Sequence, residues 1–172
     1  MPTPLDGDVA QQGDFELSSP DFEAGEQMPD WVGYANENDN PRLEISGVPD
    51  EAESLVLVLD DPDAEPVVGH VYDHWLVWDV DADQGEIPRD WDAPGDGATV
   101  GYNDYVENEY GGPAPPEGSH TYKFKLLALA DELGAPDVIR KQRLGSMIYN
   151  QTEILAATQL EATYDAEQGT IF

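Results

Sequence analysis

A continuous apolar run, SLVLVLDD at positions 54–61, is the feature of this sequence that most limits what the chain can fold into. Eight residues is a typical length for a β-strand and is too short for an ordinary helix. Because apolar side chains occupy successive positions, both faces of such a strand must be covered by other parts of the protein. The run therefore predicts a strand that is buried on both faces.

Other short segments alternate between apolar and polar residues and are separated by Gly, Pro and Asn. Turn signals recur every eight to twelve residues, which is typical of a β-sandwich. One helix is expected near residues 136–150, because Pro136 suits a first helical turn and apolar residues follow on one side. We predict an all-β chain, an antiparallel β-sandwich with one or two short helices. The further predicted strands are 15–22, 42–49, 74–80, 121–130 and 159–166.

The chain of 172 residues is expected to form one domain, since this length lies within the usual range for a single domain. Residues 1–13 are polar and rich in Pro and Gly, so we expect them to be a loosely ordered N-terminal segment. The domain itself is predicted to span residues 14–172.

The charge of the chain is extreme, with 37 Asp and Glu residues against 7 Lys and Arg residues and a formal net charge of -30. Hydrophobic residues make up 40% and gather in strand-like runs, which favours a folded chain over a disordered one. Concentrated salt relieves the self-repulsion of such a surface, because the Debye length falls to roughly 3 Å at 1 M. We therefore expect a salt-rich cytoplasm, as in haloarchaea. Nucleic acid is not expected as a partner, since a protein binds it through a basic patch.

The sequence contains no cysteine, which excludes disulfides, a thiol nucleophile and cysteine-bound zinc. It has no apolar run of 18 or more residues, so no membrane-spanning helix is expected. Residues 1–13 lack the basic leader and apolar stretch of a signal peptide. We expect a cytoplasmic protein.

Histidine chemistry in this chain must use His70, His74 or His120, because no other histidine is present. His74 opens one predicted strand and His120 directly precedes another, so both could lie at one end of the sandwich. Asp61 and Asp63 follow the buried strand. A single histidine at a strand end is more often structural, but this combination is compatible with an anion pocket, a metal site or acid–base catalysis.

The spacing of these residues supports neither a metal site nor a known hydrolase. No HExxH or His-x-His pattern occurs, and DDPDA lacks the glycine and terminal glutamate of an EF-hand. No GxSxG elbow or Walker motif is present. We expect no catalytic residue, no metal and no cofactor, with hydrolysis by His74 and Asp61 as a less favoured alternative.

The loop YGGPAPPEGSH, residues 110–120, has two readings. Its prolines would make it rigid while Gly111, Gly112 and Ala114 present backbone N–H groups to an anion. A stiff connection between two strands explains the same composition equally well.

Six motifs occur in a recognisable order: SPDF, NPRLEISGVP, LVLDDPDA, HW, GYNDY and YGGPAPPEGSHTYKFKLLAL. Over residues 14–164 the chain resembles the phosphatidylethanolamine-binding protein family, and most closely its bacterial and archaeal branch of YbhB/YbcL-type Raf-kinase-inhibitor-like proteins. The resemblance implies an antiparallel β-sandwich with a small pocket at one end. In the family this pocket binds phosphate-like anions, including the phosphoryl group of phosphoethanolamine.

The resemblance also implies which residues form the pocket and its walls. It implies a cis peptide bond between Asp61 and Pro62, a bond type that is affordable only before proline. The implied ligand-binding residues are Asp61, His74, Gly112, Ala114, His120 and Tyr122, with Pro62, Asp63, Trp75 and Tyr110 shaping the walls.

Two departures from the family pattern bear on function. Thr121 stands where the family usually has arginine, which removes a fixed positive charge, and Glu65 separates DPDA from Pro66. We predict a non-enzymatic protein that binds a small phosphoryl-like anion, with a protein-interaction or inhibitor module as the alternative. The protein partner and the oligomeric state, including a homodimer, are left open.

Overall fold

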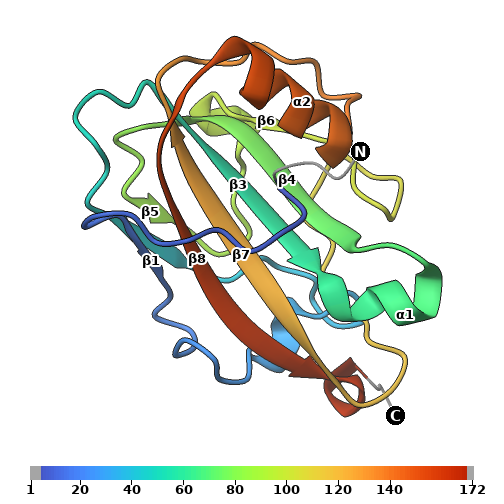
Figure 1. Cartoon of the computed structure of the whole chain (residues 1–172). Coiled ribbons are helices and arrows are strands. Elements are labelled where there is room, and N and C mark those ends of the chain that lie inside the picture. The colour runs from blue at the N-terminus through green and yellow to red at the C-terminus, as the bar shows by residue number, and fades with distance from the viewer. Residues whose placement is uncertain (1–4, 170–172) are drawn as a thin grey trace.

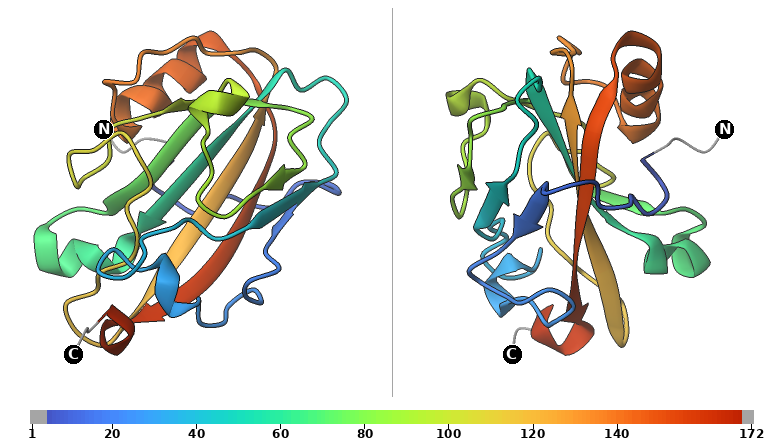
Figure 2. Two further views of the ribbon diagram at one scale, coloured as in Figure 1. Left: turned by 180° about the vertical axis from the view of Figure 1, so that it is seen from behind. Right: turned by 60° about the vertical axis from the view of Figure 1, so that its left-hand side comes forward.

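Two antiparallel sheets, packed face to face, form the body of the protein in the computed structural model, which describes residues 5–169 (Figures 1 and 2). The larger sheet has the strand order β6–β4–β3–β7–β8, and the smaller has the order β1–β2–β5. The predicted β-sandwich with two short helices is confirmed.

The strands of the smaller sheet are β1 (Glu16–Ser18), β2 (Leu43–Ser46) and β5 (Glu86–Ile87). The larger sheet contains β3 (Ser54–Asp61), β4 (Tyr72–Asp81), β6 (Thr99–Val100), β7 (Ser119–Leu129) and β8 (Ile154–Asp165). The helices are α1 (Glu65–Val68) and α2 (Lys141–Gln151), and 3-10 turns occupy Asp30–Val32, Pro62–Ala64, Pro94–Asp96 and Ala166–Gly169.

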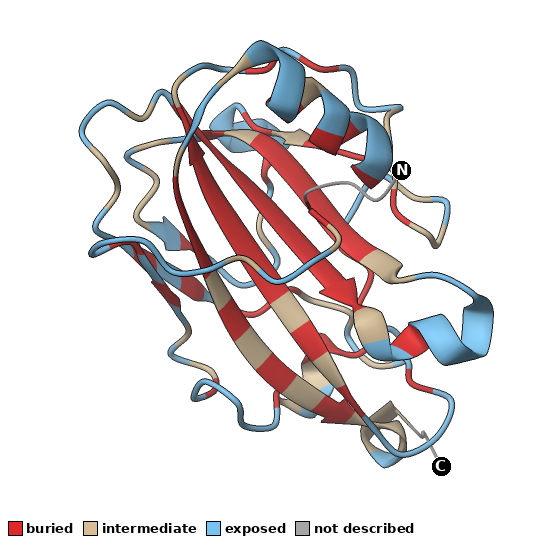
Figure 3. Ribbon diagram, viewed as in Figure 1, coloured by how far each residue is buried: buried red, intermediate tan, exposed pale blue. Residues whose placement is uncertain are grey.

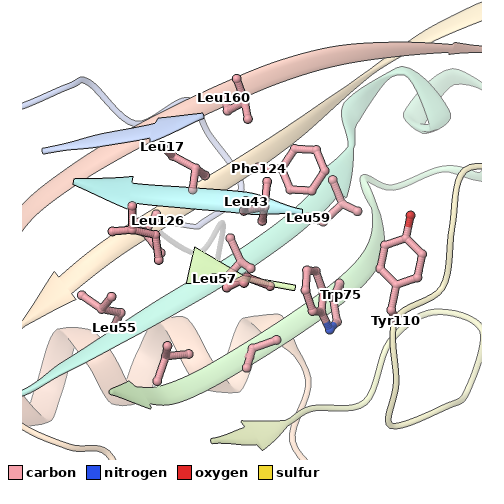
Figure 4. Packing of buried hydrophobic residues seen from close by; sticks show 14 of the residues in the cluster. Leu17, Leu43, Leu55, Leu57, Leu59, Trp75, Tyr110, Phe124, Leu126 and Leu160 are labelled. Atoms are coloured by element: carbon pink, nitrogen blue, oxygen red, sulfur yellow. The ribbon is translucent and has the colours of Figure 1, made fainter. Parts of the chain in front are cut away.

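Strand β3 lies at the centre of the larger sheet, between β4 and β7, and all eight of its residues are buried (Figure 3). This confirms the prediction drawn from the apolar run. Side chains alternate along a strand, so Leu55, Leu57 and Leu59 face the smaller sheet. Figure 4 shows them in the core that also contains Leu17 and Leu43 of the smaller sheet.

The outer face of the larger sheet is covered by α2 and by the N-terminal segment (Figure 2). Val56 and Val58 of β3 pack there against Leu144 and Ile148 of α2. Leu5 is only 1% exposed and belongs to the same cluster. Val9 packs beside this cluster, whereas most of the other residues from 7 to 13 are exposed, and residues 1–4 lie outside the described part.

The helix expected near residues 136–150 is present as α2, but it begins at Lys141 rather than near Pro136. Tertiary hydrogen bonds hold the preceding residues in a turn: the N–H of Tyr102 donates to the Ile139 carbonyl, and the Asn108 side chain donates to the Asp137 carbonyl. Contacts with loops far away in sequence thus override the preference of proline for a first helical turn.

A buried cluster of ionic side chains joins the outer face of the sheet to α2. Asp60 Oδ2 lies 2.8 Å from Lys125 Nζ and 3.1 Å from Lys141 Nζ. Lys141 also lies 2.9 Å from Asp6 Oδ1 and 2.5 Å from Asp73 Oδ1. Burial raises the pKa of Asp73 to about 6, against the opposing effect of Lys141. The Lys125 ammonium donates to the carbonyls of Leu5 and Asp6, so this cluster also anchors the N-terminal segment.

None of the helices within residues 5–169 has both the length and the apolar character required to cross a membrane.

Replacing Asp60 by leucine should lower the free energy of unfolding by about 3–5 kcal/mol, because Lys125 and Lys141 would lose the buried carboxylate that they share. Urea unfolding in concentrated KCl measures the effect, with Asp50→Asn at an exposed position as the control. The triple variant Asp60→Leu/Lys125→Met/Lys141→Met should recover part of the loss. Equal stabilities of Asp60→Leu and the control would contradict this role.

Stability should also rise with salt concentration, because the excess carboxylates repel one another and have few cations to pair with. Thermal unfolding at increasing KCl should show a rising midpoint, whereas sucrose of equal osmolality should have a smaller effect. A midpoint that is independent of KCl would show that surface repulsion contributes little.

Few cations remain to offset the excess of carboxylates. Within residues 5–169, six of the seven basic side chains already lie in ion pairs: Arg42, Arg89, Lys123, Lys125, Arg140 and Lys141.

Candidate functional site

A cavity of about 270 Å³ is lined by residues from the end of β3, the beginning of β7 and α1. Figure 1 shows where these three elements lie in the fold. The lining of the cavity combines buried polar and aromatic side chains, such as those of His74 and Tyr122, with exposed apolar ones, such as those of Val67 and Val68. The lining residues are Asp61, Ala64, Val67, Val68, Tyr72, His74, Tyr105, Ala114, Pro115, Pro116, His120 and Tyr122.

A β-bulge in β4 directs His74 into this cavity. Leu59 of β3 pairs with Trp75 and the next residue, Asp60, pairs with Asp73, so His74 is an extra residue between them. A bulge places neighbouring side chains on the same face of a strand. Trp75 accordingly packs into the core between the sheets, while His74 lines the cavity on the same side.

The imidazole of His74 is buried, and one of its nitrogens is already occupied. Nδ1 lies 2.8 Å from the carbonyl oxygen of Gly111. Because a carbonyl can only accept, Nδ1 must carry the proton in the neutral ring. Burial lowers the pKa of His74 to about 4, despite the opposing effect of the Gly111 carbonyl. At neutral pH, His74 is therefore an uncharged ring whose other nitrogen, Nε2, can accept a hydrogen bond.

Asp61 and His120 form a buried pair across the end of the sheet. Asp61 Oδ2 lies 2.6 Å from His120 Nδ1, and Asp61 Oδ1 accepts a hydrogen bond of 3.0 Å from the N–H of Asp63. Burial raises the pKa of Asp61, while the hydrogen bond from His120 acts in the opposite direction. The carboxylate fixes the orientation of the ring through Nδ1 and leaves Nε2 for a ligand.

Three tyrosines surround the two histidines. The ring centroid of His74 lies 5.0 Å from that of Tyr72, 5.6 Å from that of Tyr105 and 5.3 Å from that of Tyr122. The Tyr122 hydroxyl is buried and makes no hydrogen bond within residues 5–169. Burial raises the pKa of Tyr122, so its hydroxyl remains a neutral donor at ordinary pH. A buried hydroxyl without a partner in this cavity is a group that a ligand can satisfy.

Five of the six implied ligand-binding residues line the cavity, whereas Gly112 does not, and neither do the implied wall residues Asp63 and Tyr110. Asp63 Oδ2 accepts a 2.8 Å hydrogen bond from the N–H of Thr121, and so ties the end of β3 to β7. Tyr110 is buried in the core between the sheets, and its hydroxyl donates to the Val32 carbonyl. The five that line it are Asp61, His74, Ala114, His120 and Tyr122.

The expectation that Gly111 and Gly112 offer free N–H groups to an anion was wrong. The N–H of Gly111 donates to the His74 carbonyl, and that of Gly112 donates to Asn38 Oδ1 at 2.7 Å. Asn38 is far from the loop in sequence, so the composition of the loop could not reveal that its amides are used. The reading of this segment as a stiff connection is thus the better one for these two residues.

The implied cis bond between Asp61 and Pro62 is also not found, because the structure has no cis peptide bond in the described residues. Asp61 is extended, with φ −125° and ψ 95°, and a residue before proline favours extended backbone when the bond is trans.

Sequence reasoning missed several residues of the cavity wall. Tyr72 lies two residues before His74 on β4. Tyr105 is the last residue of the GYNDY motif, which was used only to support the family resemblance. Val67 and Val68 belong to α1, a short helix that was not predicted. The other missed residues are Ala64, Pro115 and Pro116.

The fixed charges around the cavity are few. Among the residues described, no lysine or arginine lines it, and no group of three His, Asp or Glu side chains is placed to hold a metal ion. The cavity can offer imidazole nitrogens of His74 and His120, the unpartnered hydroxyl of Tyr122 and the charged groups of the Asp61–His120 pair. These groups bind through hydrogen bonds that depend on protonation.

Comparison with known proteins identifies relatives of this chain. The family model described as phosphatidylethanolamine-binding protein matches residues 18–165. A UPF0098 protein of Methanothermobacter thermautotrophicus is 42% identical over 106 residues, which cover 60% of this chain and 68% of the relative. The UPF0098 protein YbcL of Escherichia coli is 32% identical over 160 residues, which cover 86% of each chain.

Solved structures agree with the sequence relatives. The crystal structure of Escherichia coli YbcL, described as a member of the mammalian PEBP family, aligns with a TM-score of 0.79 and 28% identity, and covers 89% of this chain and 99% of YbcL. A PEBP homolog from Chlamydia trachomatis aligns with a TM-score of 0.80 and 28% identity, and covers 88% and 97% of the two chains. With the matched fold spanning both sheets and the family model spanning nearly all of their strands, the chain belongs to the phosphatidylethanolamine-binding protein family.

Proposed function

We propose that this protein binds a small anion of the phosphoryl class in the cavity beside α1, without catalysing a reaction. The single observation that carries the proposal is the Asp61–His120 pair, which shares one small cavity with His74 and the unpartnered hydroxyl of Tyr122. An imidazolium held by a carboxylate is a strong donor for a phosphoryl oxygen. Family membership supports the same ligand class.

The threonine at position 121 does not argue against this proposal. Side chains alternate along β7, so Thr121 belongs to the opposite face from His120 and Tyr122, which line the cavity. An arginine at this position would start from the far face of the strand. The polar groups that we assign to the ligand are therefore retained in this chain.

We also propose that the cavity has no hydrolytic role. A base whose pKa is near 4 removes protons poorly at neutral pH, and burial gives His74 such a pKa. No serine, threonine or cysteine lines the cavity within residues 5–169, so that a covalent intermediate has no obvious nucleophile there.

Replacing His120 or His74 by alanine should abolish the binding of phosphoethanolamine, because each change removes a nitrogen that faces the ligand. Titration calorimetry in about 1 M KCl, where the acidic surface is screened, measures the loss. His70→Ala is the matched control, since His70 is exposed and does not line the cavity. Unchanged affinity for phosphoethanolamine in both cavity variants would contradict the proposal.

A second measurement addresses catalysis. Incubation with p-nitrophenyl phosphate and with simple carboxylic esters should give no more product than the double variant His74→Ala/His120→Ala. Turnover that requires both histidines would replace binding by hydrolysis as the function of this site.

A further inference from the structure

The orientation of His74 is set by a buried asparagine that lies outside the cavity. Asn103 is 0% exposed, and its Nδ2 donates to the carbonyls of His74 and Glu109 at 3.2 and 2.7 Å. Its Oδ1 accepts from the N–H groups of Tyr105 and Glu107 at 2.9 and 3.1 Å. All of its hydrogen-bonding groups are thus used to hold the loop that follows β6.

This loop holds the imidazole through the Gly111 carbonyl, and the Gly112 carbonyl also acts on the ring. The Gly111 carbonyl lies 2.8 Å from His74 Nδ1, and the N–H of Gly111 returns a bond of 3.0 Å to the His74 carbonyl. A Cβ at position 111 would lie 2.3 Å from the Tyr105 ring, so only glycine fits there. The loop therefore fixes the proton of the neutral ring on Nδ1.

The other nitrogen of His74 is consequently an acceptor. The hydrogen bond to Gly111 is made by Nδ1, which leaves Nε2 for a ligand, and burial keeps the ring unprotonated at neutral pH. The titratable groups that surround it are Tyr72 on its own strand, Tyr105 from the loop, Tyr122 and His120 from β7, and Asp61 from β3. The tyrosines remain neutral, so the nearby charge is that of the Asp61–His120 pair.

A doubly charged ligand is poorly matched to these groups. The Asp61–His120 pair is neutral overall even when His120 is an imidazolium, and no lysine or arginine lines the cavity in the described chain. The lone pair at His74 Nε2 would repel an unprotonated phosphoryl oxygen, whereas a P–OH group would donate to it. The second pKa of a phosphomonoester lies near 6, so both protonation states exist at accessible pH.

We propose that the cavity selects the monoanion of a phosphomonoester, with the P–OH group donating to Nε2 of His74 and the other oxygens accepting from Tyr122 and His120. The selection rests on the proposed function, since it concerns the same cavity. In this proposal, His74 distinguishes the protonated ligand from the unprotonated one, because only a P–OH group can donate to Nε2. Asn103 is a positioning residue that acts on His74 through the loop.

Methyl phosphate and methyl sulfate provide the matched pair of probes. They have nearly the same shape, and methyl sulfate is a permanent monoanion without a proton to donate. Titration calorimetry of each in about 1 M KCl, from about pH 5 to about pH 8, separates the proton on the ligand from titration of the protein. The pH profile of methyl sulfate reports the protein alone.

At the acidic end, methyl phosphate should bind at least about tenfold tighter than methyl sulfate, as expected for one additional hydrogen bond to a buried group. Its dissociation constant, divided by that of methyl sulfate, should rise about tenfold per pH unit above the second pKa of the ester. Binding in two buffers of different ionisation enthalpy should show uptake of about one proton per methyl phosphate above that pKa.

Variants then assign the effect to His74. His74→Phe keeps a ring but removes the acceptor, so whatever binding remains should show no preference for methyl phosphate, while His70→Phe should leave the preference intact. Thermal unfolding shows whether each variant is folded, and the comparison of the two ligands on the unmodified protein stands independently of the variants.

Two outcomes overturn different statements. If methyl phosphate binds but its affinity relative to methyl sulfate does not depend on pH, or increases above the second pKa, selection of the monoanion is wrong and the proposed function stands. If neither methyl phosphate nor phosphoethanolamine binds at any pH, the proposed function fails, and the selection fails with it.

Discussion

Two adjacent carboxylates at the end of β3 point to opposite faces of the larger sheet, and both halves of the structure depend on how each is paired. Burying a carboxylate is costly unless cations or donors surround it. On the outer face, Asp60 is held by Lys125 and Lys141, which join β7, α2 and the N-terminal segment. On the inner face, Asp61 is held by His120 and lines the cavity. The strand that organises the fold thus also delivers the polar group of the site.

The cavity solves an electrostatic problem that follows from the composition of the chain. A protein with a formal charge of -30 is a poor environment for a second negative charge. Most of its cations are committed to ion pairs elsewhere, and none of the lysines or arginines described lines the cavity. Recognition of an anion in this cavity must therefore depend on protons carried by the side chains and by the ligand. Hydrogen bonds to neighbouring groups determine which atom carries each proton. The loop held by Asn103 performs this placement at His74, and Asp61 performs it at His120.

How much the sequence reveals can be judged from particular elements. The apolar run predicted the buried strand β3 because burial on both faces leaves a direct mark on residue type. The resemblance to a family located Asp61, His74 and His120. Strict alternation along β4 would have placed His74 on the opposite face from Trp75, and only the bulge, a matter of register between strands, puts both on one face. The same limit applies to Gly112, whose N–H is occupied by Asn38. The β3–β4 register and the contact between Gly112 and Asn38 both join segments that are distant in sequence, so neither can be predicted from local sequence.

The placement of the lysines has a practical consequence for the chemical handling of this protein. The chain has three lysines; the Lys125 side chain is 0% exposed, that of Lys141 is 3% exposed and that of Lys123 is 18% exposed. All three contact the N-terminal segment, through Leu5, Asp6 or Asp8. Reagents that attack amines, such as crosslinkers and fluorescent esters, would find little lysine to react with while the protein is folded. Labelling of Lys125 or Lys141 would instead report that the N-terminal segment had come away from the sheet.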